Sequence, residues 1–168
     1  MIEEMLDLVD DAGNVLEVLP RSVVFAQKRN NFRLVIAVFV NHDRTKFLVG
    51  RRALSKKESP GALCHIGGCV EAGESYEDAF KREVMEESGI DVSRYEWRLM
   101  GHLNPTKHDS RGYVAVYELV VDPAQAIEWN REDFEDKQWY SHDELQQIIA
   151  QKSVLMAPNF PKPHIYFY

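Results

Sequence analysis

The sequence lacks the features of several large protein classes. It has only two cysteines, Cys64 and Cys69, which are too few for a disulfide framework and fit a reducing compartment. Its longest apolar run, Leu34 to Val40, is far too short to span a bilayer. The N-terminus reads MIEEMLDLVDD, which is acidic where a secretory signal peptide would be basic. We therefore expect a cytoplasmic protein with no membrane partner.

Positive charge is scarce. The chain carries 20 Lys and Arg against 27 Asp and Glu, a net charge of -7. A general nucleic-acid binder would show a basic face, so we expect no nucleic-acid partner. A small anionic substrate remains compatible, because a bound metal ion can supply positive charge. No repeat or linker interrupts the 168 residues, and this length suits one domain over residues 1–168.

Apolar segments alternate with turns and predict an α/β or α+β fold. Strands are expected at residues 5–9, 15–19, 32–40, 47–52, 63–70, 95–103, 112–121 and 138–140. Helices are expected in a short stretch opening at Pro20, over Ser75 to Ser88, and over about 143–151. Residues 1–30 would form an N-terminal hairpin and short helix, and the proline-containing residues 157–168 an extended C-terminal tail.

The helix expected over Ser75 to Ser88 carries acidic residues on its apolar face. At about 100° per residue, Glu83 and Glu87 continue the stripe begun by apolar side chains one and two turns earlier, and Glu86 lies at its edge. Such residues are usually solvated. The alternative is a hard divalent cation, which would relieve the repulsion among three packed carboxylates. Spacing alone leaves both interpretations open.

The segment from Gly68 to Ile90 resembles the Nudix box, G-x5-E-x7-R-E-U-x-E-E-x-G-U, where U is a bulky apolar residue. All nine fixed positions match: Gly68, Glu74, Arg82, Glu83, Val84, Glu86, Glu87, Gly89 and Ile90. The resemblance implies an α/β/α sandwich with a central mixed β-sheet. It also implies a Mg²⁺-dependent hydrolase, with Mn²⁺ as a substitute, that cleaves a diphosphate linkage in a nucleoside diphosphate derivative or related small molecule.

The resemblance also implies roles within the box. Glu83, Glu86 and Glu87 would hold the metal with the Gly68 carbonyl, and Glu87 is the best single candidate for the catalytic base. Glu74 would support the junction between loop and helix and add a ligand through water. Arg82 would orient the glutamates; an exposed pairing of Arg82 with Glu86 is the plainer interpretation.

A second resemblance is to Nudix proteins related to type-I isopentenyl diphosphate isomerase. It rests on Asp7 to Asp10, Gly13 to Val15, Pro20-Arg21, Leu48 to Arg52 and Pro60-Gly61. Those isomerases carry a Cys-x-His-Pro motif before the helix and a degenerate box, whereas this chain reads Cys64-His65-Ile66 and has an intact box. This departure argues against isomerase activity. The alternatives to hydrolysis are nevertheless an isomerase-like enzyme and a catalytically silent diphosphate-binding module.

Basic residues at the end of the strand expected at 47–52, and just after it, are candidates for substrate binding. Arg51 or Arg52, with Lys56 or Lys57, would grip a terminal phosphate; a solvated basic loop is the alternative. Strand alternation allows only one of the two arginines to face a pocket.

Other polar and aromatic residues are weaker candidates. Four late acidic residues are possible bases but are expected to be surface charges: Glu128, Glu132, Glu135 and Asp136. We expect His102 and His108 on the surface and three tryptophans, Trp97, Trp129 and Trp139, in the core. Cys64, His65 and Cys69 lack the spacing of a soft-metal site, so buried cysteines and a core or pocket histidine are expected. A homodimer is compatible with the sequence.

Overall fold

Strands form where β-branched and aromatic residues concentrate, and helices where capping residues flank a periodic segment. The structure is a computed structural model that describes residues 2–168. In chain order the elements are β1 (Met5–Val9), β2 (Val15–Pro20), α1 (Arg21–Ala26), β3 (Arg33–Val40), β4 (Lys46–Arg52), β5 (Leu63–Cys64), β6 (Ile66–Cys69), α2 (Tyr76–Ser88), the 3₁₀ turn η1 (Val92–Arg94), β7 (Trp97–Leu103), α3 (Pro105–His108), β8 (Tyr113–Val120), β9 (Phe134–Ser141), α4 (His142–Gln151) and α5 (Lys162–Tyr166).

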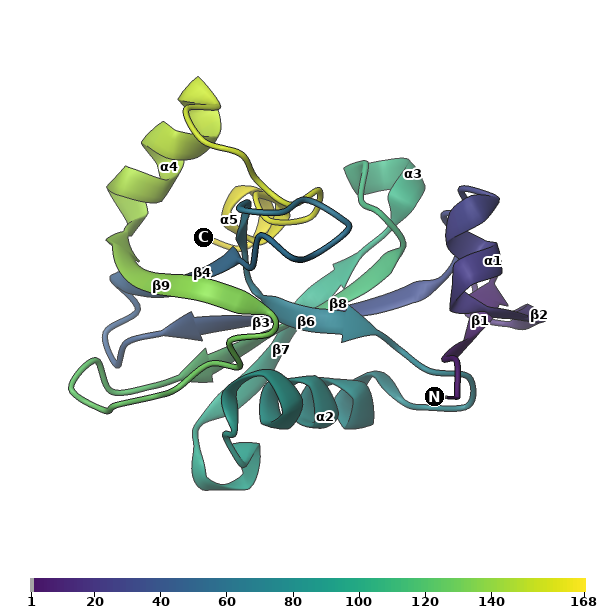
Figure 1. Ribbon diagram of the computed structural model, residues 1–168, viewed down its shortest axis with the longest axis horizontal. Helices are drawn as coiled ribbons and strands as arrows, with labels where there is room; N and C mark the ends of the chain where they lie inside the picture. The colour runs from purple at the N-terminus through teal and green to yellow at the C-terminus, as the bar shows by residue number, and fades with distance from the viewer. Residues whose placement is uncertain (1) are drawn as a thin grey trace.

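A mixed seven-stranded sheet forms the centre of the molecule. Its main path runs β5-β4-β3-β8-β7, with β6 added to β3 and β9 added to β4. The pair β3–β8 is parallel, and the other pairs are antiparallel. In Figure 1, α2 lies on one face of this sheet, and α4 and α5 lie on the other. The expected α/β fold with a central mixed sheet is therefore confirmed.

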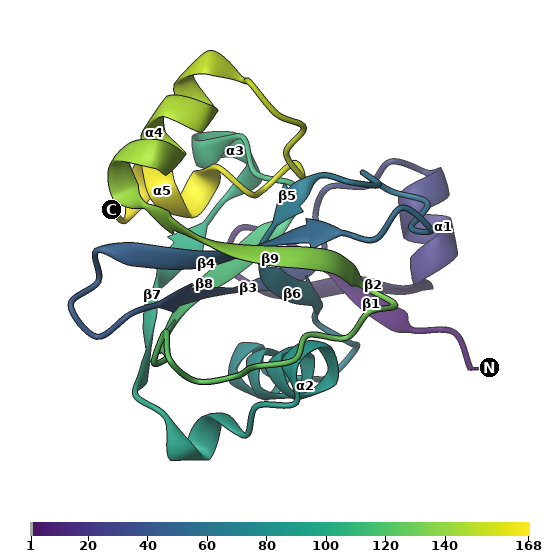
Figure 2. The same cartoon turned by 60° about the vertical axis from the view of Figure 1, so that its left-hand side comes forward.

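Strand β3 shows how one sequence serves both layers. Its residues alternate between the two faces, as the period of two in a strand requires. Val35, Ala37 and Phe39 join the core under α2, and the intervening Ile36 and Val38 join the core under α4 and the C-terminal segment. Burial on both faces explains why this segment is apolar without alternation in its sequence. Figure 2 shows the sheet between these two helical layers.

The sheet divides where β4 leaves β3. These strands pair only at Phe39↔Leu48 and Val40↔Phe47. Beyond that point β4 continues with β9 and β5, while β3 takes β6 as its antiparallel partner. In the described part of the chain, β6 has no second strand partner, so it presents a free edge beside the point of divergence. The glycines Gly67 and Gly68 lie on this edge strand.

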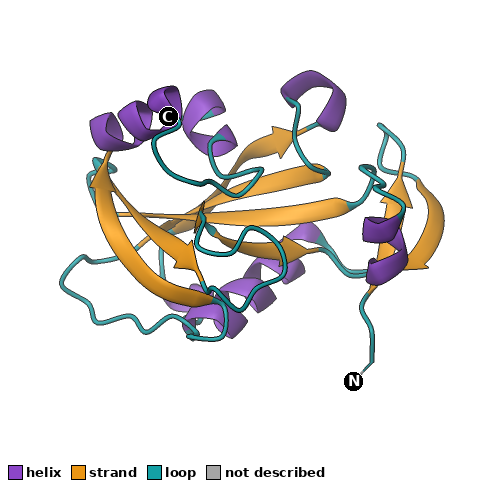
Figure 3. Cartoon of the chain, turned by 45° about the horizontal axis from the view of Figure 1, so that its top comes forward, coloured by secondary structure: helices purple, strands orange, loops and turns teal. Residues whose placement is uncertain are grey.

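The N-terminal hairpin packs at the end of the main sheet (Figure 3). β1 and β2 pair antiparallel. Leu6 and Leu8 are fully buried, and they pack with Val24 of α1 and with Phe32, which directly precedes β3. The hairpin is also tied to the loop before α2. Asp7 accepts hydrogen bonds from the Gly73 amide at 2.9 Å and from Arg33 at 2.9 Å. This buried carboxylate therefore links the hairpin, the sheet and the loop that leads into α2.

The C-terminal tail differs from the expectation. Residues 157–168 are not simply extended, because they contain the short helix α5. Pro161 and Pro163 lie at its start, where the first amides have no partner within a helix and a proline therefore costs no hydrogen bond. Phe160 and His164 are buried, which anchors the segment against the sheet. The prolines begin this helix rather than prevent it.

Other expected elements form close to their predicted bounds. Strand β9 is longer than expected, because its polar residues pair with β4 along an exposed face. The capping box at Ser141 and Glu144 is present in full. None of the helices among residues 2–168 is long and apolar enough to cross a membrane.

Candidate active site

The local sequence holds the acidic segment firmly inside α2. The Ser75 hydroxyl caps the first turn by accepting a hydrogen bond from the Asp78 amide at 3.0 Å. Gly89 ends the helix with a left-handed φ of 67°, which costs glycine no steric penalty. Ala79, Phe80 and Val84 are fully buried and fix the rotation of the helix against the sheet. The expected helix is thus confirmed, and its cap and stop keep the glutamates away from fraying ends.

Two glutamates of α2 lie against the backbone of β6. A Cβ on Gly68 would lie 2.3 Å from the Glu83 Oε1 atom, so only glycine leaves room for this carboxylate. The Glu87 carboxylate accepts a hydrogen bond from the Gly67 amide at 3.0 Å. At Gly67, a Cβ would lie 2.1 Å from the Val35 carbonyl oxygen of the neighbouring strand. The paired glycines therefore let helix, edge strand and sheet approach one another at one place.

Arg82 organises the acidic residues around it. Its Nε and Nη2 atoms donate to the two Glu74 oxygens, both at 2.9 Å, and its Nη1 donates to Glu83 at 2.8 Å. Nη2 also donates to the Cys69 carbonyl at 3.0 Å, whereas Glu86 is 3.5 Å away. Glu74 in turn accepts from the Glu71 amide at 2.9 Å. Arg82 therefore acts chiefly through Glu74 and Glu83, and its contact with Glu86 is the weakest of these.

The carboxyls of Glu83 and Glu87 are short of compensating charge. Burial raises the pKa of Glu83 to about 7, although Arg82 acts to lower it. Burial and the nearby Glu83 charge raise the pKa of Glu87 to about 8, and the Gly67 amide offsets only part of this. Perturbed carboxyls held together in this way are typical of sites that bind a cation or move a proton.

The donors here suit a hard divalent cation. Carboxylate and carbonyl oxygens are the ligands that Mg²⁺ and Mn²⁺ prefer, and the Glu83 carboxylate packs directly against the backbone of Gly68. Glu86 is more than half exposed. Among residues 2–168, no three His, Cys, Asp or Glu side chains are gathered closely enough to enclose an ion. Arg82 and the Gly67 amide hold two of the glutamates in the present arrangement.

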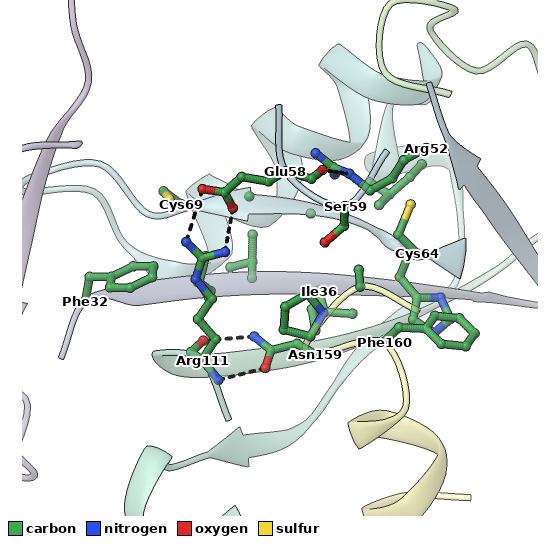
Figure 4. Close-up of a pocket in the computed structure, with 18 of the residues that line it drawn as sticks. Phe32, Ile36, Arg52, Glu58, Ser59, Cys64, Cys69, Arg111, Asn159 and Phe160 are labelled. Carbon is green, nitrogen blue, oxygen red and sulfur yellow. Dashed lines mark hydrogen bonds and ion pairs between the residues drawn. The ribbon is translucent and has the colours of Figure 1, made fainter. Parts of the chain in front are cut away.

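A cavity of about 170 Å³ lies beside β6, lined by Gly67 and Gly68. Its other walls come from α1, the loop after β4, the turn before β8 and the segment around Asn159 (Figure 4). Three arginines line it: Arg21, Arg52 and Arg111. The cavity thus joins positive charge to the edge strand whose glycines contact Glu83 and Glu87.

Comparison with known proteins decides the family. The NUDIX domain matches residues 31–160. The chain belongs to the Nudix family. It is 36% identical over 143 residues to an uncharacterized Nudix hydrolase of Nostoc sp., over 84% of this chain and 83% of that protein. It is 31% identical to a Nudix hydrolase of Deinococcus radiodurans, over 88% of this chain and 85% of that protein. The crystal structure of DR0079 from Deinococcus radiodurans matches with a TM-score of 0.88 at 27% identity, covering 98% and 99% of the two chains.

The Nudix family acts on small nucleotide-derived substrates, and Nudix hydrolases generally use divalent metal ions. A protein of Pseudomonas aeruginosa named NAD-capped RNA hydrolase NudC is 36% identical over 104 residues, which are 61% of this chain and 35% of that protein. The absence of a nucleic-acid partner therefore stays a prediction, as do the homodimer and the likeness to isopentenyl diphosphate isomerase relatives.

The basic residues after β4 separate as strand alternation predicts. Arg52 lines the cavity and donates to the Glu58 carbonyl at 3.0 Å. Arg51 does not line it, and its guanidinium donates to the Gly61 carbonyl at 2.9 Å. Lys57 is exposed outside the cavity lining, and Lys56 pairs with Asp133. The Nudix site in this conformation thus places only Arg52 of this group beside the glycines of β6.

The late acidic residues lie on the surface of the Nudix domain, as expected. All four candidates are exposed: Glu128, Glu132, Glu135 and Asp136. The same loop nevertheless reaches the site, because the Asn130 amide donates to the Glu87 carbonyl at 2.7 Å. Asp133, paired with Lys56, lies close enough to affect the pKa of Glu87. Sequence reasoning missed Asp133, whose position follows from the pairing of β4 with β9.

The remaining candidates have structural surroundings. Trp129 is buried, and Trp97 and Trp139 pack against the same core, as expected. His102 is exposed, while the His108 Nδ1 accepts a hydrogen bond from the Asn104 amide at 2.8 Å. Both cysteines are free and buried, and burial raises each thiol pKa to about 12. His65 lines the cavity and stacks on Phe160.

Proposed function

We propose that this Nudix hydrolase is Mg²⁺-dependent and cleaves a diphosphate linkage in a nucleoside diphosphate derivative or related small molecule by attack of water on phosphorus. One observation carries the proposal. Two partly buried glutamates with raised pKa values pack on the Gly67-Gly68 edge of β6, and an arginine-lined cavity adjoins the same edge. Carboxylates without sufficient counter-charge next to an anion-binding surface suit a metal bridging to phosphate.

The residues that would hold the metal are Glu83, Glu86, Glu87 and the Gly68 carbonyl, with Glu74 contributing through water. When bound, Mg²⁺ neutralises phosphate oxygens and lowers the pKa of the attacking water. Arg82 keeps Glu83 and Glu74 in place by the contacts at 2.8 and 2.9 Å. To join these ligands, the exposed Glu86 would have to turn toward Glu83 and Glu87, and its contact with Arg82 at 3.5 Å would weaken.

Glu87 is the residue proposed to take up the proton of the attacking water. Its carboxylate is held in place by the Gly67 amide at 3.0 Å. A bound cation would lower its raised pKa and keep it ionised, as a base must be. Arg52 would contact an anionic part of the substrate from the cavity, and roles for Arg51 and Lys57 would require movement of the loop after β4.

The test is a substrate screen with Mg²⁺ and with Mn²⁺. The panel should include nucleoside diphosphates, nucleoside diphosphate sugars and reduced nicotinamide dinucleotide, the last because of the relatives named NAD-capped RNA hydrolases. We expect release of a monophosphate from at least one compound, with ¹⁸O from labelled water in a product phosphate. Glu87→Gln is the matched inactive control.

Two results would reject the proposal. Tight binding of panel members without any product would indicate a diphosphate-binding module. Double-bond migration in isopentenyl diphosphate, added to the same panel, would indicate an isomerase.

A further inference from the structure

Two of the three cavity arginines are held together by a shared aromatic ring. The Arg21 guanidinium lies 5.1 Å from the centroid of the Phe25 ring, and that of Arg111 lies 4.6 Å from the same centroid. Cation–π attraction of this kind favours both positions. Phe25 therefore brings together two like charges from segments ninety positions apart in the sequence.

The backbone of Arg111 is clamped from the opposite side. Its amide donates to the Asn159 side-chain oxygen at 2.8 Å, and the Asn159 side-chain nitrogen donates to the Arg111 carbonyl at 2.8 Å. Figure 4 shows this reciprocal pair at the base of the Arg111 side chain. The guanidinium is thus preorganised from two directions, which lowers the entropy cost of binding an anion.

Two carboxylates of the chain already pair with arginines of this group. The Arg21 Nη1 atom donates to the two Glu4 oxygens at 3.2 and 3.1 Å. Glu58 pairs with Arg111 through contacts of 2.6 and 3.4 Å, and its own backbone carbonyl accepts from Arg52 at 3.0 Å. The Arg111 hydrogen bond, with the charges of Arg21 and Arg52, holds the pKa of Glu58 below its ordinary value. Glu58 lies in the loop after β4, and in Figure 4 its side chain extends across the labelled cavity residues toward Arg111.

We propose that Arg21, Arg52 and Arg111 form the site for an anionic end of the substrate, a phosphate or carboxylate, and that Glu58 is an internal competitor displaced when this end binds. The inference rests on the proposed function, and it names the chemical group that the arginine-lined wall of the cavity would bind. A guanidinium fork matches phosphate and carboxylate in the same bidentate geometry, so an incoming anion can replace Glu58 at Arg111 without moving the arginine.

The experiment measures binding without catalysis. Inorganic diphosphate is titrated by calorimetry into the full chain in EDTA. Removing the competitor by Glu58→Gln should tighten binding about threefold or more, the scale of one partly exposed ion pair. Arg111→Met should weaken binding about tenfold or more, and Arg111→Lys should recover part of it, because lysine keeps the charge without the fork.

The matched control is Glu17→Gln. Glu17 pairs with Arg29 at 3.4 Å on the hairpin, and its side chain is 46% exposed, close to the 48% of Glu58. This variant should bind diphosphate as the parent chain does. Unchanged thermal unfolding of each variant would show that the fold is intact.

Each outcome bears on one proposal. Weaker binding by Glu58→Gln, or equal binding by all variants, would overturn the competitor model. Where a substrate is turned over, the model also requires Glu58→Gln to lower KM with kcat little changed. Binding that follows the predicted order without turnover of any panel compound would reject the hydrolase proposal and leave the anion site standing.

Discussion

Glu118 on β8 and the glutamates of α2 are both withdrawn from solvent, and the two groups are compensated differently. Glu118 on β8 is fully buried within the sheet. It accepts hydrogen bonds from Arg44 Nε at 2.8 Å, Arg98 Nε at 2.9 Å and the Tyr168 hydroxyl at 2.6 Å. Burial acts to raise the pKa of Glu118, but these three partners outweigh it, and the pKa lies below its ordinary value.

The carboxylates of α2 show the opposite balance. Glu83 shares Arg82 with Glu74, and Glu87 is held by an amide dipole, so burial prevails and both pKa values rise. Burying a charge is costly unless it is paired. A carboxylate with enough hydrogen-bonding and ionic partners in the chain stabilises the fold. A carboxylate with too few such partners can instead bind a ligand that supplies positive charge. We therefore interpret Glu118 as a structural residue and Glu87 as the residue that the proposed function uses.

The sharpest test of this contrast is Glu87→Gln. We expect kcat to fall on the order of 1,000-fold, because a lost metal ligand and base removes several kcal/mol of transition-state stabilisation. The free energy of unfolding of the metal-free protein should stay equal or rise, because a neutral amide suits the buried position better than a carboxylate. Steady-state kinetics and urea denaturation check the two parts. A clear loss of stability would make Glu87 a structural residue.

Glu118→Gln should behave in the reverse way. Removing this charge weakens three hydrogen bonds at a buried position, and we expect a loss of about 2 kcal/mol in the free energy of unfolding. The loss is limited because Arg44 keeps Glu96 and Arg98 reaches solvent. Turnover should be unchanged at a temperature where the variant is folded. Tyr168→Phe, which deletes one of the three hydrogen bonds, should cost about 1 kcal/mol. Equal stability of all three proteins in urea would contradict the comparison.

The comparison of buried ionisable groups extends to a pair of histidines, which burial keeps uncharged. The Nε2 atoms of His65 and His164 lie 2.9 Å apart, so they share one proton. Burial lowers the pKa of His164 to about 4 and that of His65 well below its ordinary value.

The unfolded chain binds protons near pH 6.5, where the folded chain does not, so this stability is present above pH 6.5 and is lost as pH falls. Between pH 7 and pH 5 His164 should lose about 2 kcal/mol of stabilisation, whereas Glu83 and Glu87, whose pKa values are raised, gain stability over the same range. The contribution of His164 is therefore measured as a difference in denaturant unfolding: the change in unfolding free energy between the two pH values should differ by about 2 kcal/mol between His164→Gln and the parent chain, and substitution of the exposed His42 by Gln should leave it unchanged. A dependence that is equal in both variants would show that these imidazoles do not cause it.

The smallest effect is expected for Gly68→Ala. The new Cβ would meet the Glu83 carboxylate and displace it, which should weaken Mg²⁺ binding about tenfold, the scale seen when support for a ligand is lost. Calorimetry with Mg²⁺ measures this directly. Gly73→Ala is the control, because a Cβ there would meet nothing within 4 Å and acts only through its positive φ. Equal Mg²⁺ affinity in both variants would remove Gly68 from the site.

The sequence predicts the local parts of this molecule well. The cap at Ser75, the stop at Gly89 and the helical stripe between them are set by residues within a few positions of one another, and the structure confirms all three. The proline-containing tail was predicted wrongly, because whether a proline begins or excludes a helix depends on packing of residues such as Phe160.

The parts that escaped prediction depend on distant contacts. Glu118 is one polar residue in an apolar strand, and its partners Arg44 and Tyr168 are far away along the chain. Asp133 comes near Glu87 through the register of two strands. The pairing of Arg21 with Arg111 needs Phe25 between them. None of these leaves a periodic signal in sequence, because each is created by folding.

The position of residues 2–30 bears on which part of the chain determines substrate specificity. Residues 2–30 precede the region matched by the NUDIX domain, yet they supply Arg21 and Phe25 to the cavity, while Asp7 fastens the loop before α2. On the proposed function, residues 2–30 supply one wall of the ligand cavity, whereas Arg52, Arg111 and the glutamates come from within residues 31–160. Exchanging residues 2–30 between two relatives would replace one wall of the cavity and leave the glutamates of α2 unchanged. We then expect substrate preference to change with residues 2–30, and metal dependence to stay with α2.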